Sequence, residues 1–176
     1  MKLNKFVVAM GLGVTLFSGM TMAAGENNGT ITFTGSIATS PCSIKDDQLN
    51  QTIPMGQISN KVLDKGGKSS PEAFTIQLID CIVAETDDAV SITFSGTVAD
   101  SNKDNFALLG GTAKGASLAI VDEKANPVKF GAKTPLKTLA KGTNDLNFSA
   151  YLVGDASGTI VPGEFTVPAN FVLTYE

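Results

Sequence analysis

Apolar side chains occupy every second position in several short stretches of this chain. This period of two is typical of half-buried β-strands. Glycine-rich and Asn-Pro sequences, which are common in turns, separate the stretches. Short strands of this kind predict an all-β sandwich, with one short helix expected at residues 58–65. The alternating positions are Gly29, Ile31, Phe33, Gly35 and Ile37; Phe74, Ile76 and Leu78; Val90, Ile92 and Phe94; Leu118 and Ile120; Leu146, Phe148, Ala150 and Leu152; and Ala169, Phe171, Leu173 and Tyr175.

The alternation reaches both ends of the chain once a removable leader is set aside. Chain ends are normally frayed and polar unless something holds them. A terminus that is itself an apolar strand can pair with another molecule. The two ends, 29–37 and 169–175, therefore indicate a protein whose function is assembly.

The leader has the features of a secretory signal peptide. Lys2 and Lys5 form a positive start, residues 6–17 are mostly apolar, and Thr21 and Ala23 are small residues suited to a cleavage site. We expect residues 1–23 to be removed, although cleavage after Ala24 fits as well. The apolar run is too short to span a bilayer comfortably, and no later segment is a better candidate. The remaining residues, about 153, suit a single domain.

Cys42 and Cys81 are the two cysteines of this exported chain, and export favours a disulfide between them. Closing a loop of about 40 residues contributes roughly 4 kcal/mol in the chain-entropy model. The alternative is a pair of free thiols that bind a metal or act as a nucleophile. The chain contains no His to assist either role, so the disulfide is preferred.

Charge and composition argue against several classes of function. Without Lys2 and Lys5, 11 of the 13 basic residues remain against 17 acidic ones, a net charge of −6, and none is Arg. This disfavours nucleic acid as a partner. The lack of His removes the Ser-His-Asp arrangement, so an enzyme is not expected.

One acidic segment has part of a calcium-loop pattern. Residues 100–104 place oxygen-bearing side chains at positions one, three and five, but Asn105 and Gly111 stand where Gly and Glu are required. A polar loop is the better interpretation, and we expect no cofactor and no metal.

Several motifs together resemble the chaperone-usher pilins, the subunits of type 1 and P fimbriae. Gly35 lies in an alternating strand seven residues before Cys42, which follows Pro41. The second cysteine ends a strand in Leu78-Ile79-Asp80-Cys81. Gly163 is fourteenth from the end of the chain, and Tyr175 is next to last.

The resemblance implies an incomplete immunoglobulin-like β-sandwich that lacks its last strand. It implies an N-terminal donor-strand extension at residues 24–38 and a pilin domain at 39–176. The donor strand would present Gly29, Ile31, Phe33, Gly35 and Ile37 to the groove of a neighbouring subunit. Gly163, Phe171, Leu173, Tyr175 and Glu176 would form the acceptor groove and chaperone contact, with the terminal carboxylate of Glu176 held by basic residues of the chaperone.

The implied partners are neighbouring pilins, a periplasmic chaperone that lends a strand to the groove, and an outer-membrane usher where the extension of the next subunit replaces it. The protein would pass through the periplasm to the bacterial cell surface and enter a fimbrium. We expect a major, repeating subunit for surface adhesion, because the chain is too short for an adhesin's additional domain. Alternatives are an adaptor or minor subunit, and a self-contained secreted β-sandwich that binds a ligand. The donor strand does not reveal whether the groove has the open last pocket that pilus-ending subunits lack.

Overall fold

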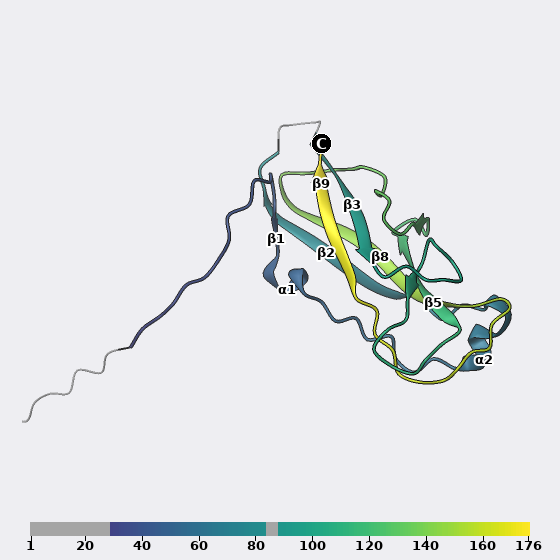
Figure 1. The fold of residues 1–176 in the computed structure, drawn as a ribbon. Coiled ribbons are helices and arrows are strands. Elements are labelled where there is room, and N and C mark those ends of the chain that lie inside the picture. Colours follow the sequence, from purple (N-terminus) through teal and green to yellow (C-terminus); the bar gives the residue numbers. More distant parts are fainter. Residues whose placement is uncertain (1–28, 84–87) are drawn as a thin grey trace, which may run out of the picture. The chain divides into compact units, whose positions relative to one another are not determined.

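A computed structural model of the chain describes residues 29–83 and 88–176 (Figure 1). The predicted signal peptide lies outside these residues. The chain divides into two compact units, residues 1–36 and 37–176. In the first unit, residues 29–36 form no helix or strand and their side chains are exposed. An isolated segment has no strand beside it to bond with, so the alternating pattern alone produces no strand there.

The second unit is a sandwich of two antiparallel sheets. The larger sheet has the strand order β1-β2-β8-β5-β4, with β6 also paired to β5, and the smaller has the order β7-β3-β9. Short helices α1 (Asp46–Leu49) and α2 (Asn60–Leu63) and a 3-10 turn, Asp64–Gly66, lie between β1 and β2. The strands are β1 (Ser43–Ile44), β2 (Glu72–Cys81), β3 (Ala89–Gly96), β4 (Phe106–Ala107), β5 (Ala116–Asp122), β6 (Pro127–Val128), β7 (Lys137–Thr138), β8 (Gly142–Gly154) and β9 (Ala169–Tyr175).

The alternating positions of β2, β3, β5 and β8 form the core, as predicted. In β8, buried and exposed residues alternate from Asn144 to Phe148. An aromatic cluster joins the two sheets: the ring centroid of Phe94 lies 5.1 Å from that of Phe148 and 6.2 Å from that of Phe74. The aliphatic core around it includes Ile76, Leu78, Val90, Ile92, Leu146 and Leu152.

The predicted disulfide between Cys42 and Cys81 is present, and both residues are buried. It ties the residue before β1 to the end of β2. The side-chain amide of Asn144 lies against it, with Nδ2 3.3 Å from the Cys81 sulfur. Because the disulfide fixes the chain at residue 42, the folded unit has a defined end at which the N-terminal segment leaves.

Some elements differ in extent from the sequence prediction, whereas the last strand, Ala169–Tyr175, has the same bounds as the alternating positions that predict it. The helix expected at residues 58–65 is a single turn, which ends where Lys65 adopts a positive φ of 58°. The other short elements contain two to four residues, too few to produce a recognisable period.

An open groove beside the last strand

Strand β9 pairs with β3 along one side only. The N–H and C=O of Glu176 both bond Ala89, at 2.9 Å each. Hydrogen-bonded pairs recur at every second residue of an antiparallel ladder. Even-numbered residues of β9 therefore bond β3, while the N–H and C=O groups of Ala169, Phe171, Leu173 and Tyr175 point to the other edge. No strand among the described residues pairs with that edge.

The same odd-numbered residues turn their side chains toward the core. Phe171, Leu173 and Tyr175 are half-buried and pack against the buried cluster, whereas Val172 on the opposite face is 59% exposed. The ring of Phe171 lies 6.5 Å from that of Phe94. Burial raises the pKa of the Tyr175 phenol. One edge of β9 thus combines unpaired backbone groups with apolar side chains.

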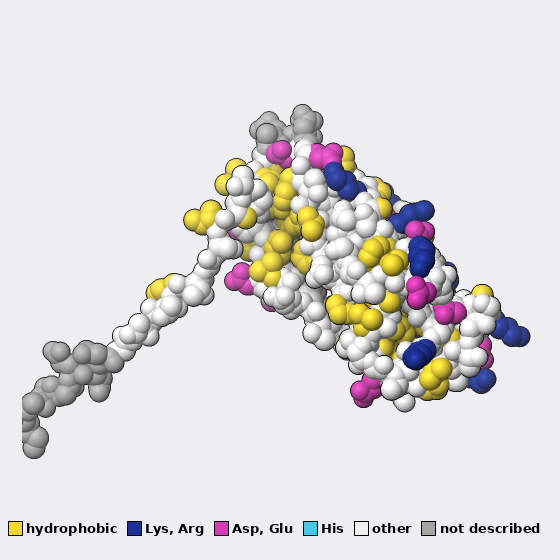
Figure 2. Space-filling model, in the orientation of Figure 1, with side chains coloured by type: hydrophobic (Ala, Val, Ile, Leu, Met, Phe, Trp, Pro, Cys, Tyr) yellow, Lys and Arg dark blue, Asp and Glu magenta, His cyan; other side chains and the backbone are white. Residues whose placement is uncertain are grey.

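A groove of about 1590 Å³ opens along this edge. It is larger than the roughly 300–1,000 Å³ of typical small-molecule pockets. Figure 2 shows apolar side chains exposed in patches on the face that carries β9, with charged side chains mainly along one border. The groove floor includes Phe74 and Ile76 of β2, Leu118 and Ile120 of β5, and Ala150 of β8. A chain segment with apolar side chains matches this groove in size and character.

Residues 51–60 form the wall opposite β9. Ile53, Met55 and Ile58 are half-buried there. Within the described chain, residues 52–58 make no backbone–backbone hydrogen bond. The groove is therefore bordered on both sides by backbone groups that lack strand partners.

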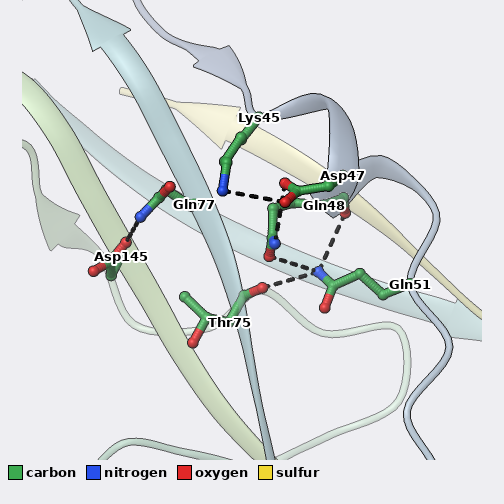
Figure 3. A network of polar contacts seen from close by, with 7 residues as sticks. All are labelled: Lys45, Asp47, Gln48, Gln51, Thr75, Gln77 and Asp145. Atoms are coloured by element: carbon green, nitrogen blue, oxygen red, sulfur yellow. Dashed lines mark hydrogen bonds and ion pairs between the residues drawn. The ribbon is translucent and has the colours of Figure 1, made fainter.

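A polar network holds the chain where it crosses from β1 to this wall (Figure 3). The Lys45 ammonium lies 3.1 Å from the Asp47 carboxylate, and its hydrogen bond lowers the pKa of that carboxyl group. Gln48 donates to Asp47, and Gln51 donates to Gln48. Gln51 Nε2 also donates to the C=O of Thr75 at 2.9 Å. This bond satisfies a β2 carbonyl beyond the reach of the short strand β1.

A two-stranded ribbon closes the groove at the end near α2. Residues 109–114 and 161–166 pair through reciprocal backbone bonds: Leu109 with Thr166 at 2.8 and 2.7 Å, and Lys114 with Val161 at 3.1 and 2.9 Å. Gly163 lies in this ribbon. A Cβ on Gly163 would stand 2.1 Å from Thr112 Oγ1, so a close approach of backbones requires glycine here.

The structure brings only part of the predicted acceptor set into the groove itself. Gly163 and Phe171 line it, while Leu173 and Tyr175 continue the same face toward the C-terminus. The side chain of Glu176 forms an ion pair of 2.8 Å with Lys133.

Groove residues that were not predicted include Ile58, Leu108, Ile160, Phe165 and Val167. Phe165 and Val167 continue the period of two backward from Ala169, so this signal was available. The others lie in segments without a periodic pattern.

Among residues 29–83 and 88–176, no group of three or more His, Cys, Asp or Glu residues is arranged to hold a metal ion. No helix in the same residues is long and apolar enough to cross a membrane.

Comparison with known proteins gives the family. Residues 31–176 match the model of the Fimbrial protein family. The chain is 47% identical to Fimbria A protein of Serratia marcescens and 43% identical to Major MR/P fimbria protein of Proteus mirabilis (strain HI4320), each over the full length of both chains. Its fold is similar to the crystal structure of the P pilus rod subunit PapA, with a TM-score of 0.69 and 30% identity over 78% of this chain and 100% of that one. This chain belongs to the fimbrial protein family and is a chaperone-usher fimbrial subunit with the incomplete immunoglobulin-like pilin fold.

Proposed function

We propose that this protein is the major, repeating subunit of a fimbria, and that each copy inserts residues 24–38 into the groove beside β9 of the preceding copy. One observation carries the proposal: the same chain has an open apolar groove and an exposed apolar segment of matching period. Ile31, Phe33 and Ile37 are 79%, 89% and 104% exposed. Burying such side chains in a groove lined by Phe171 and its neighbours favours association.

The chemistry is strand addition to an open sheet edge. The edge of β9 offers N–H and C=O groups at every second residue, and an incoming strand supplies the complementary groups. Its groove-facing side chains would stand directly opposite Phe171, Leu173 and Tyr175, because opposed residues of a ladder share a face. The period of two at residues 29–37 provides such a face.

We infer an antiparallel donor in which Gly35 lies opposite Phe171. Every strand pair among the described residues is antiparallel, and antiparallel pairing is slightly more stable per residue than parallel pairing. Gly35 then leaves room beside the Phe171 ring, and Ile37 meets the small Ala169. Phe33 faces Leu173 and Ile31 faces Tyr175.

The end of the groove near Ala169 supports a subunit that continues a fibre. Apolar Leu108 and Val167, which adjoin the paired residues Leu109 and Thr166, line the groove there. In the family that this chain resembles, subunits that terminate a pilus lack an open pocket at the corresponding end. An open pocket would let the next donor begin its exchange, with Ile37 entering first.

The same proposal includes export of the subunit and the proteins that assist its assembly. Residues 1–23 would direct export, a periplasmic chaperone would cover the groove, and an outer-membrane usher would be the place of exchange. The fibre would then present the protein at the cell surface for adhesion. An adaptor or minor subunit remains the second candidate, because it would have the same groove and donor.

Deletion of residues 24–35 tests the mechanism. In a periplasm that contains the cognate chaperone, the truncated subunit should still bind the chaperone, because its groove is intact. It should fail to donate, so no fibres form from it alone. Thr32→Ala, on the other face of the donor, is the matched control and should polymerise normally. Fibre formation by the truncated subunit would contradict donation by this segment.

Immunogold electron microscopy separates the two subunit classes. A major subunit labels the whole shaft, whereas labelling confined to fibre tips would identify an adaptor.

A further inference from the structure

We propose a second contact between successive copies, which rests on the proposed function: Ile82 of the donating copy packs against Leu109 and Val161 on the ribbon of the receiving copy. The ribbon is the pair of segments 109–114 and 161–166 defined above. The contact would join the end of one sandwich to the opposite end of the next. It would lie at the end of the groove, where the donor strand leaves it.

The short connection between donor and sandwich forces the two copies together. Only residues 38–41 separate Ile37 from the disulfide-bound Cys42. Five Cα steps span at most about 17 Å when fully extended. The connection is held closer than that, because the Ser40 hydroxyl donates to the C=O of Cys42 at 2.6 Å. The donating sandwich therefore lies against the receiving copy, within reach of direct contact.

Ile82 stands beside the point from which the donor segment leaves its own sandwich. Its N–H donates to the C=O of Pro41, the last residue of the connection, at 2.8 Å. The disulfide at Cys81 is its immediate neighbour, so its position is fixed. Its side chain is 82% exposed. A single exposed Ile is ordinary on a protein surface, but this one lies where the connection forces a neighbour to be.

The receiving end is the ribbon that closes the groove. With Ile37 opposite Ala169, the donor leaves the groove toward residues 161–168. Val161 lines the groove there and is 41% exposed, and Leu109, paired with Thr166, is 39% exposed. Figure 1 shows β1 and this ribbon at opposite ends of the sandwich formed by residues 37–176. An end-to-end arrangement thus brings Ile82 of one copy toward Val161 and Leu109 of the next.

The contact would limit bending of the joint. A donor strand alone leaves the four connecting residues as a hinge. A second point of attachment beside the hinge fixes the angle between neighbouring sandwiches. Burial of one Ile against two aliphatic side chains would favour one angle without being needed for donation itself.

Site-specific photo-cross-linking tests the contact. A photoreactive phenylalanine derivative replaces Ile82, and fibres are assembled from a mixture of isotope-labelled and unlabelled full-length subunits. After irradiation, mass spectrometry should find residue 82 linked to residues 109–114 or 161–166 of a different copy. The same probe at Val172, which is exposed on the outer face of β9, should not label that ribbon. Leu109→Asp in the receiving copy changes a ribbon residue whose side chain does not line the groove, and it should reduce the product at least tenfold while fibres still form.

The possible failures are distinguishable. Fibres that form normally but give no link from position 82 to the ribbon would overturn the contact and leave strand donation standing. A reciprocal probe at Val161 should reach the peptide that contains Ile82, and its failure to do so in intact fibres would count against the contact as well. If unmodified subunits form no fibres with their chaperone and usher, the proposed function itself is wrong, and the contact with it.

Discussion

Phe33→Ala in the donor segment gives the most direct energetic test of groove filling. Phe33 is 89% exposed in the single chain, so its removal should leave the subunit's own fold unchanged. In the fibre the side chain would be buried opposite Leu173. Phe→Ala in a packed core costs about 3–5 kcal/mol. Taking about 3 kcal/mol, the donor should dissociate roughly 150-fold more easily.

The assay is depolymerisation of assembled fibres in guanidinium chloride. With a slope of about 4 kcal/mol per molar, the midpoint should fall by about 0.7 M. Thr34→Ala is the matched control: it changes the adjacent residue, whose side chain would point away from the groove, and it should change stability by less than about 0.5 kcal/mol. Equal effects of the two substitutions would refute the idea that only one face of the donor strand enters the groove. A Phe33→Ala midpoint unchanged from the native one would refute it as well.

The remaining predictions concern other parts of the same contact. Gly35→Arg should abolish the ladder of polymers on unheated denaturing gels, because the side chain would collide with the groove opposite Phe171. Chaperone binding should persist, because a Cβ at Gly35 meets no atom within 4 Å in the single chain. A persisting ladder would contradict the fit of Gly35 opposite Phe171. Replacing both disulfide cysteines by alanine should lower the free energy of unfolding by about 4 kcal/mol for a sequence separation of 39. The measurement is denaturation of the donor-filled subunit. A loss below about 1 kcal/mol would show that the crosslink is dispensable. Burial raises the pKa of the Tyr175 phenol. The contribution of this neutral phenol to stability is therefore complete below the ordinary tyrosine pKa and is lost as the pH rises through the raised pKa. In a Tyr151→Phe background, groove filling should move the ultraviolet titration of Tyr175 to still higher pH, and a movement to lower pH would contradict burial of Tyr175 by the donor.

The sequence predicts the sandwich well because its long strands carry their own signal. In β2 and β8, alternate residues must face the core, so apolar residues such as Ile76 and Leu146 recur there with a period of two. The disulfide follows from compartment and count alone. The fold's incompleteness, however, came from resemblance, since the alternation of Phe171 and Leu173 is equally compatible with a closed sandwich.

The far wall and the closed end of the groove could not be predicted in the same way. Residues 51–58 border the groove because the side chain of Gln51 bonds a β2 carbonyl 24 residues away in sequence. The ribbon depends on backbone pairing between segments about 50 residues apart, across which Gly163 permits close approach. Contacts of this kind leave no local period, so only the three-dimensional structure reveals them.

The distribution of donor and acceptor over one chain also determines the kind of assembly. In the proposed mechanism each copy has one donor segment and one groove, formed by different residues, so the interface would be heterologous. Such an interface continues into an open filament unless its rotation closes a ring. With a connection of only residues 38–41, each added copy should sit end to end on the last and leave its own groove open to the next donor. Purified chaperone-bound subunits, mixed with usher, should therefore give a ladder of increasing lengths on size-exclusion chromatography. A single dimer peak that resists further growth would mean that two copies exchange donors reciprocally, and would contradict both the end-to-end arrangement and the contact of Ile82 with the ribbon.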